Sequence, residues 1–362
     1  MNSGIINLQK NFFQEKEKLF LDFNGLKASL FIYQSGVEAV KLENERGSII
    51  VLPYQGQQVW DAQFDRRRLT MKTMFPYPKK TQQYLHTYGA FVIYCGALRM
   101  GNPGPEDSHP LHGELPNAEY EDAAVIYGED EGGEYIGLTG RYIYTEAFAS
   151  CYHALPIVKL HRNSTVLNLV MTIQNQSAYP MELMFMYHIN FRPVDNGRIV
   201  QSFRWSPETM EVRTSIPKHV KVSQEFLNML EEVKRDPKTT EVIKSGVVYR
   251  PELVMFLTSP ISDTQGWSHN LQVHPDGSAD YIAYRPRELD HVTRWMVRTL
   301  DKEALGLILP ATCDPEGYTA EKKKGNIKEI PAQGSVVFHA RAGLLDRTQA
   351  TKMEKTINNL VH

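Results

Sequence analysis

Short runs in which apolar and polar residues alternate follow one another along almost the whole 362-residue chain. Clear examples are LKASLFIY at 26–33, PIVKLHR at 156–162, TVLNLVMTIQNQ at 165–176 and SVVFHARAGLL at 335–345. A period of two places successive side chains on opposite faces of a strand, and short turns rich in Asn, Gly, Pro and Ser separate the runs. This pattern predicts an all-β fold with a large antiparallel sheet system, in which 165–191 forms a hairpin joined near Ser177–Pro180.

Helical signals are few. The segment SQEFLNMLEEVKRDP at 223–237 has a serine cap, apolar residues at helical spacing and a proline stop, so it predicts a helix within a polar excursion over about 206–245. Met353, Ile357 and Leu360 share one helical face and predict a closing helix over about 349–360. Because no linker or repeat divides the chain, we expect a single domain over 1–362 with its core at about 25–345.

Charge and targeting signals narrow the function classes. The 40 Lys+Arg and 42 Asp+Glu residues give a formal charge of −2, which provides no overall field to attract nucleic acid or a membrane surface. We find no signal-peptide pattern and no run of 18 apolar residues, and the three cysteines form no CxxC pair. We therefore expect a cytoplasmic protein without nucleic-acid or membrane partners. Exposed sheet edges leave room for a homodimer.

Polar chemistry is concentrated in three segments. The sequence has no P-loop, dinucleotide glycine pattern, G-x-S-x-G elbow or H-E-x-x-H helix, so no nucleotide, cofactor or metal is expected. The three segments are the loop at 95–117 with Arg99, Asn102, His109, His112 and Glu114, the strand MYHINF with His188, and the turn at 310–325 with Asp314 and Glu316. Taken singly, the loop is equally typical of a solvated loop, whereas a lone histidine on an apolar strand is more often a core residue and an acidic turn more often only faces water.

The order of these segments resembles the aldose 1-epimerase (galactose mutarotase-like) superfamily. Gly96–Asn102, with one residue fewer between Gly and Arg, is similar to its Gly-x-x-x-Arg-x-x-Asn motif, and Leu111–Gly113 is similar to its Leu-His-Gly motif. Tyr187–Phe191 is similar to its second histidine strand, and Ile330–Gly334 to its closing Pro-Gly turn. Within the superfamily the chain most resembles a divergent bacterial branch known mainly as a domain of unknown function. The resemblance spans roughly 25–345.

This resemblance implies a galactose mutarotase-like β-supersandwich with few short helices and a sugar-binding cleft. It also implies interconversion of the α and β anomers of an aldose by acid/base ring opening and closure, a reaction that needs no cofactor. His188 would be the general acid at the ring oxygen, and His112 would hydrogen-bond that oxygen or a neighbouring hydroxyl. Arg99 would orient a hydroxyl or hold a negative substituent, and with Arg285 or Arg287 it could favour an acidic sugar.

The base is where the sequence departs from the family. Cys313-Asp314-Pro315-Glu316 stands where the family has Cys-x-Glu, so either Asp314 or Glu316 would be the base, with Glu316 slightly favoured. Residues i and i+2 of an extended chain share a face, so both carboxylates could enter the cleft. Further substrate-binding candidates are Asn102, His109, Asp290 and an aromatic platform from Trp295 or Trp60.

Two other functions use the same residues. His109, His112, Glu114 and His188 include ligand types that could hold a divalent metal for a cupin-like sugar isomerisation. Alternatively, the altered Cys-Asp-Pro-Glu segment is compatible with a sugar-binding or sensing protein that has lost its catalytic base.

Overall fold

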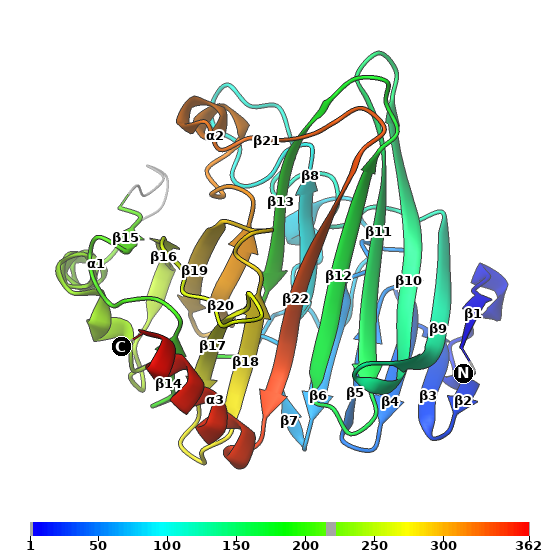
Figure 1. Cartoon of the computed structure of the whole chain (residues 1–362), viewed down its shortest axis with the longest axis horizontal. Coiled ribbons are helices and arrows are strands. Elements are labelled where there is room, and N and C mark those ends of the chain that lie inside the picture. Colours follow the sequence, from blue (N-terminus) through cyan, green and yellow to red (C-terminus); the bar gives the residue numbers. More distant parts are fainter. Residues whose placement is uncertain (1–2, 215–221, 362) are drawn as a thin grey trace.

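Two large antiparallel sheets pack face to face in the computed structural model, which describes residues 3–214 and 222–361 (Figure 1). The nine-stranded sheet has the order β1 (Gly4–Asn7), β9 (Asp122–Asp130), β10 (Gly133–Glu146), β11 (Ser150–His161), β12 (Val166–Asn175), β22 (Ser335–Leu345), β18 (Ala279–Tyr284), β17 (Ser268–Val273) and β14 (Arg198–Gln201).

The second sheet has thirteen strands, eleven of which form one continuous path. Their order is β15 (Met210–Val212), β16 (Tyr249–Leu257), β19 (His291–Arg298), β20 (Glu303–Ala311), β13 (Met181–Ile189), β8 (Val92–Ala97), β6 (Val59–Phe64), β5 (Gly47–Val51), β4 (Glu38–Asn44), β3 (Leu26–Ile32) and β2 (Lys18–Phe23). β21 (Lys328–Ile330) pairs with β13, and β7 (Arg67–Arg68) pairs with β6. The all-β prediction is therefore confirmed.

Three α-helices lie at the periphery in the described part of the chain. α1 (Gln224–Arg235) begins after Ser223, whose hydroxyl accepts a hydrogen bond from the Phe226 amide at 3.2 Å, as the sequence predicts. α3 (Arg347–Val361) packs on the outer face of β14 and β17. α2 (Tyr318–Lys324) was not predicted, because this short lysine-rich segment has no apolar period. Short 3-10 turns occur at Lys10–Phe12, Tyr84–His86 and Pro237–Thr240. None of the described helices combines the length and the apolar character needed to cross a membrane.

The predicted hairpin over 165–191 is wrong. β12 pairs with β11 and β22, whereas β13 pairs with β8, β20 and β21, so the two strands belong to different sheets. The side-chain nitrogen Nδ2 of Asn175 lies within hydrogen-bond distance of the Tyr179 and Pro331 carbonyls. These contacts fix the connection between β12 and β13 where the chain crosses from one sheet to the other. A period of two identifies strands but does not identify their partners.

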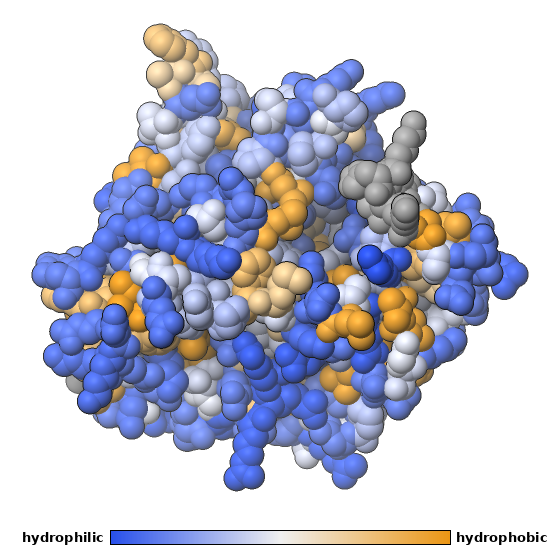
Figure 2. Space-filling view, turned by 180° about the vertical axis from the view of Figure 1, so that it is seen from behind, coloured by the Kyte–Doolittle hydropathy of each residue, from blue (hydrophilic) through white to orange (hydrophobic). Residues whose placement is uncertain are grey.

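The two faces of β13 have different surroundings. Phe185, Tyr187 and Ile189 pack in the core between the sheets, and Tyr187 donates a hydrogen bond to the Phe338 carbonyl of β22 at 2.9 Å. Met184 and Met186 belong to a second cluster on the outer face of the thirteen-stranded sheet, and His188 shares their face. Figure 2 views the molecule from this side, where apolar side chains gather near the middle of a largely hydrophilic surface. His188 is thus directed away from the core between the sheets.

Candidate functional site

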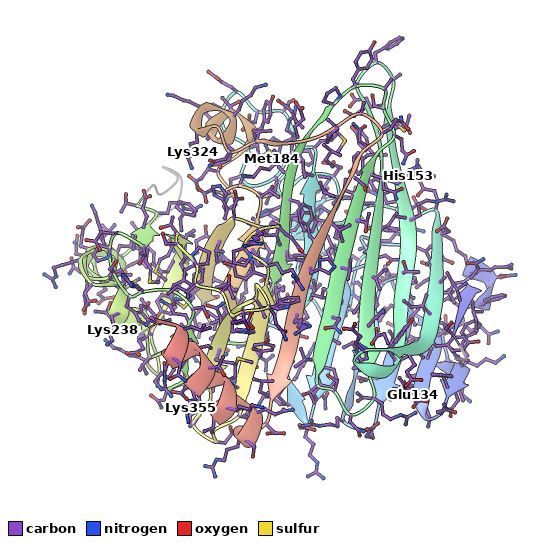
Figure 3. All side chains as sticks on the ribbon, in the orientation of Figure 1. Glu134, His153, Met184, Lys238, Lys324 and Lys355 are labelled. Atoms are coloured by element: carbon purple, nitrogen blue, oxygen red, sulfur yellow. The ribbon has the colours of Figure 1, made fainter. Side chains whose placement is uncertain are left out.

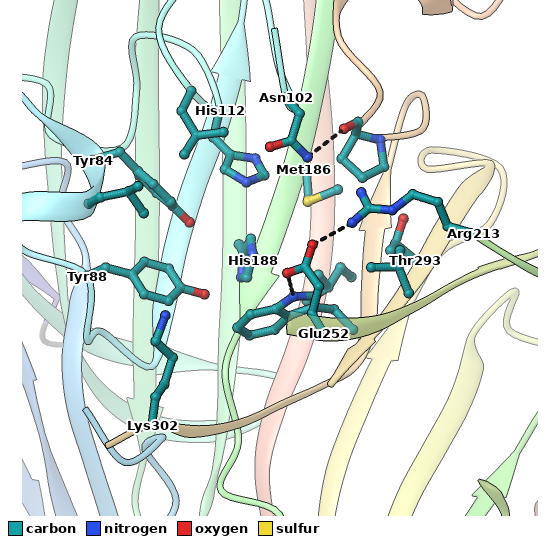
Figure 4. Close-up of a pocket in the computed structure, with 16 residues that line it drawn as sticks. Tyr84, Tyr88, Asn102, His112, Met186, His188, Arg213, Glu252, Thr293 and Lys302 are labelled. Atoms are coloured by element: carbon teal, nitrogen blue, oxygen red, sulfur yellow. Dashed lines mark hydrogen bonds and ion pairs between the residues drawn. The ribbon is translucent and has the colours of Figure 1, made fainter. Parts of the chain in front are cut away.

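A pocket of about 640 Å³, part of it open to solvent, lies on the outer face of the thirteen-stranded sheet (Figure 4). Its floor comes from alternate residues of neighbouring strands, and its walls come from the loops above them. The polar and aromatic residues that line it are Tyr84, Tyr88, Asn102, His112, His188, Arg213, Glu252, Thr293, Trp295 and Lys302. A pocket with this mixed polar and aromatic lining suits a small polar ligand such as a monosaccharide.

His188 has a defined tautomer. Its Nδ1 lies 2.8 Å from Asn190 Oδ1, while Asn190 Nδ2 donates to the Ala90 carbonyl at 3.0 Å. The amide oxygen therefore faces the imidazole, so Nδ1 carries the proton and the Nε2 lone pair is free. Burial, aided by the charge of Lys302, lowers the pKa of His188 to about 4. The ring is therefore neutral at pH 7, and its Nε2 can accept a hydrogen bond or a proton.

His112 lies beside His188. The ring centroids are 5.4 Å apart and the ring planes are nearly perpendicular, at 88°. Burial and the neighbouring His188 hold the pKa of His112 well below its usual value of 6.5. Its Nδ1 is buried without a hydrogen-bond partner among the described residues. Two neutral imidazoles thus meet in one pocket.

The loop that carries His112 is closed by two glycines. The amide of Gly96, at the end of β8, donates to the His112 carbonyl at 3.0 Å, and the His112 amide donates to the Gly101 carbonyl at 3.0 Å. Gly113 has φ +83°, and a Cβ there would lie 2.0 Å from the Arg99 carbonyl oxygen. Only glycine fits at this approach, so the His-Gly pair positions the histidine.

Glu252 on β16 is the only carboxylate side chain among the pocket's described lining residues. One of its oxygens pairs with Arg213, and the other accepts a hydrogen bond from Trp295 Nε1 at 2.6 Å. Arg213 also lies 3.4 Å from Glu316 Oε1. Two donors therefore fix the orientation of the Glu252 carboxylate, and each oxygen keeps a lone pair for a ligand hydroxyl.

Aromatic rings and a lysine complete the wall. Burial raises the pKa of Tyr84 and of Tyr88 well above 10, so both phenols stay protonated and can donate hydrogen bonds. Trp295 contacts His188 with a centroid separation of 5.4 Å. Lys302 Nζ lies 5.1 Å from the centroid of the Tyr88 ring, and burial lowers the pKa of this lysine.

A family model described as "Domain of unknown function (DUF4432)" matches residues 34–343. The chain belongs to this family. No curated protein matches the sequence. The family assignment confirms the predicted likeness to a branch of unknown function.

Solved structures identify the fold of this DUF4432 protein. A proposed aldose 1-epimerase from Klebsiella pneumoniae has a TM-score of 0.82 at 14% identity, with 100% of this chain and 96% of that chain covered. A galactose mutarotase-like protein from Clostridium acetobutylicum gives 0.58 at 13% identity, covering 90% and 100%. A galactose 1-epimerase from Lactobacillus acidophilus gives 0.53 at 9% identity, covering 95% and 98%. At such identities these likenesses establish the predicted galactose mutarotase-like β-sandwich, and the fold alone.

Four of the residues predicted from the sequence meet in the pocket: Asn102, His112, His188 and Trp295. The two predicted carboxylates lie beside it. Asp314 contacts His291 Nδ1 at 3.1 Å and Lys324 Nζ at 3.2 Å, and Glu316 pairs with Arg213. Neither lines the pocket, although Pro315 between them does.

Other predicted residues lie elsewhere. Arg99 and His109 line a separate recess, where Arg99 pairs with Glu182 at 3.2 Å and stacks 3.6 Å from the Tyr318 ring centroid. Asp290 is exposed and pairs with Lys328. Trp60 is buried with Tyr84 and Tyr88 in the cluster on the outer face of the sheet. Arg285 packs on Trp267, with 4.7 Å between the guanidinium and the ring centroid.

The residues of the metal hypothesis are separated by the fold. Glu114 accepts hydrogen bonds from the Ala97 and Leu98 amides at 2.9 and 2.8 Å and from the Tyr152 hydroxyl at 2.7 Å, so it anchors the loop. His109 and Glu114 line the other recess, apart from His112 and His188 in the pocket. Across residues 3–214 and 222–361 no three His, Cys, Asp or Glu side chains are grouped for a metal ion.

Sequence reasoning missed Tyr84, Tyr88, Arg213, Glu252 and Lys302. Glu252 had a detectable signal, because it is the only acidic residue of the strand YRPELVMFL and directly precedes its apolar run LVMFL. Lys302 lies in an ordinary polar turn between β19 and β20, and nothing in that turn distinguishes it from a solvated lysine.

Proposed function

We propose that this protein is a carbohydrate isomerase that interconverts the α and β anomers of an aldose or aldose derivative bound in the pocket. The observation that carries the proposal is the neutral His188 with a free lone pair on Nε2. His188 lines the same pocket as His112 and Glu252. The galactose mutarotase-like fold supports it. The chemistry needs proton transfer at two oxygens of one carbon, which a histidine can perform near neutral pH.

In the proposed reaction, His188 Nε2 takes the proton of the anomeric hydroxyl while the bond between C1 and the ring oxygen breaks. The electron pair of the broken bond stays on the ring oxygen as an alkoxide, and an aldehyde forms at C1. The imidazolium then gives the same proton to this alkoxide. The aldehyde then rotates about C1–C2, and the reverse steps close the ring on its other face. Both oxygens are attached to C1, so one nitrogen can serve them in turn. This differs from the roles implied by the resemblance, in which His188 is the acid and Glu316 or Asp314 the base.

The neighbouring groups have supporting roles in this proposal. The Glu252 carboxylate accepts hydrogen bonds from sugar hydroxyls, and its negative charge stabilises the transient imidazolium. His112 and Asn102 hydrogen-bond the sugar, and Trp295 offers an apolar surface for one face of the ring. Tyr84 and Tyr88 donate hydrogen bonds as neutral phenols.

The test is anomeric exchange measured by NMR and by polarimetry on freshly dissolved α-anomers. We expect the wild-type protein to equilibrate at least one aldose faster than buffer alone, and His188→Ala to reduce that rate to background while the fold is retained. The matched control is His153→Ala, on the distant strand β11 labelled in Figure 3. If no neutral or acidic aldose exchanges faster than in buffer, the proposal fails.

The placement of Asp314 and Glu316 outside the pocket lining favours one second candidate. A protein without the family's usual carboxylate base could bind a sugar without converting it. Saturable sugar binding with no catalysed exchange would establish this function in place of the isomerase.

A further inference from the structure

Lys302 contributes a free ammonium group to the pocket. Its backbone is fixed by the turn between β19 and β20, where the Thr299 amide donates to the Lys302 carbonyl at 2.8 Å and the Lys302 amide donates to Thr299 Oγ1 at 3.2 Å. The side chain extends from this turn to the Tyr88 ring (Figure 4). Among the described residues no carboxylate lies within 4.0 Å of its Nζ.

The other cation of the pocket is already neutralised. Arg213 pairs with Glu252 and with Glu316, approaching Glu252 from the side away from Lys302 in Figure 4. Glu252 is also bound by Trp295 Nε1, so its two oxygens are both engaged by other donors. Arg213 is thus held in two ion pairs, whereas Lys302 has no carboxylate in contact, and Glu252 acts on Lys302 only at longer range, where it offsets part of the effect of burial on the lysine pKa.

The position of Lys302 disfavours leaving its charge unpaired. Water reaches this half-buried side chain only partly, and the Tyr88 ring, 5.1 Å away, replaces only part of the lost hydration. His112 and His188 are neutral and supply no negative charge. A neutral sugar in the pocket would exclude more water from the ammonium without giving it a counter-charge.

We infer that the substrate is an aldose with an anionic substituent, a carboxylate, sulfonate or phosphate, that pairs with the Lys302 ammonium. This inference rests on the proposed function and specifies its substrate class. It assigns to Lys302 the role for which the sequence offered Arg99, Arg285 and Arg287. Of these, Arg99 lines the separate recess and Arg285 packs on Trp267.

The experiment compares anomeric exchange of glucose, glucuronate, glucose 6-phosphate and a glucose 6-sulfonate. We expect kcat/KM for at least one anionic sugar to exceed that for glucose by tenfold or more. Lys302→Met should remove this preference by raising KM for the anionic sugar at least tenfold relative to KM for glucose, and Lys302→Arg should restore the preference in part. Any effect on kcat through the pKa of His188 should be common to all four sugars. Lys355→Met is the control, since Lys355 lies on α3 at the opposite end of the molecule from Met184 and Lys324 (Figure 3). The three anionic sugars separate carboxylate, sulfonate and phosphate recognition.

Failure of the inference is distinguishable from failure of the proposed function. Exchange of glucose at least as efficient as that of every anionic sugar, or equal losses on all sugars in Lys302→Met, overturns the inference and leaves the isomerase intact. If no sugar exchanges, calorimetric titration with the same four sugars decides. Tighter binding of an anionic sugar that Lys302→Met abolishes supports the inference, and equal or absent binding of all four overturns it.

Discussion

Asn190 Oδ1 accepts the Nδ1 proton of His188 at 2.8 Å, and Asn190 Nδ2 is itself bound to the Ala90 carbonyl. Asn190 therefore cannot turn its amide nitrogen toward the imidazole without losing the hydrogen bond to the Ala90 carbonyl. The Asn190 side chain thus fixes the tautomer of His188, which lies two residues before it in the chain. The free Nε2 in the proposed mechanism depends on this contact.

Asn190→Ala should reduce activity while His188 remains in place. Without the amide oxygen the ring can place its proton on Nε2, and a histidine in the wrong tautomer or orientation loses a large part of its catalytic effect, roughly tenfold or more in kcat. Asn190→Asp should retain the acceptor and, through its negative charge, raise the pKa of His188. Exchange rates and a histidine NMR titration check both. Activity unchanged in Asn190→Ala, with Asn228→Ala as the exposed control, would remove Asn190 from the mechanism.

The pH dependence of exchange separates the two possible roles of His188. The pKa of about 4 predicts that kcat/KM is level from pH 8 to pH 6 and falls as the pH approaches 4, because Nε2 becomes protonated. If the imidazolium instead acted as the acid, the rate would increase as the pH falls over the same range. Rates must be corrected for the buffer-catalysed reaction at each pH. Asn190→Asp should move the acid limb to higher pH.

Burial of neutral His188 also makes stability depend on pH. Its pKa is about 4 in the folded protein against 6.5 unfolded, so between these values the unfolded chain binds more protons. The resulting contribution of His188 to the free energy of unfolding is complete above pH 6.5 and is lost as the pH falls to 4. It amounts to about 3 kcal/mol over that range. We expect the stability advantage of the wild type over His188→Gln to shrink by up to this amount between pH 7 and pH 4 in urea unfolding. Parallel stability curves would contradict this.

The carboxylates can be ranked by single amide substitutions. Glu252→Gln should lower kcat about 10- to 100-fold, since the pocket loses its only described carboxylate while size and shape are retained. Glu316→Gln should have a smaller effect, transmitted through Arg213, and Asp314→Asn should leave kcat close to wild type. Should Glu316→Gln or Asp314→Asn be the inactive variant, the base is the one that the family resemblance implies, and Glu252 only positions Arg213.

The fold was largely predictable because strand periodicity is local. The alternation in 165–176 and in 335–345 marks β12 and β22 directly, and the cap at Ser223 marks the start of α1. Strand pairing was not predictable, since it depends on contacts between distant residues. β12 and β13 are neighbours in sequence, yet they lie in opposite sheets.

The site was predictable where a motif carried a residue and unpredictable where tertiary packing supplied it. His112 and His188 were found through motif order, and they meet in the pocket. Glu252 and Lys302 come from strands and turns whose approach to those histidines is decided by sheet order alone. Arg99 was misleading for the same reason, because the loop turns its side chain toward Glu182 in the other recess.

Gly113 tests whether the loop geometry, rather than the histidine alone, makes the site. At Gly113 the backbone has φ +83° and an added Cβ would lie 2.0 Å from the Arg99 carbonyl, so Gly113→Ala combines backbone strain with a steric clash that only loop movement can relieve. We expect a loss of stability of roughly 2 kcal/mol or more and a large loss of activity as His112 is displaced. Gly325→Ala is the matched control: its φ is +80°, but nothing lies within 4 Å of the added Cβ, so only the strain of about 1 kcal/mol should appear and exchange should be unaffected. Thermal unfolding and exchange rates measured together decide the matter, because an active Gly113→Ala protein would show that the position of His112 does not limit the reaction.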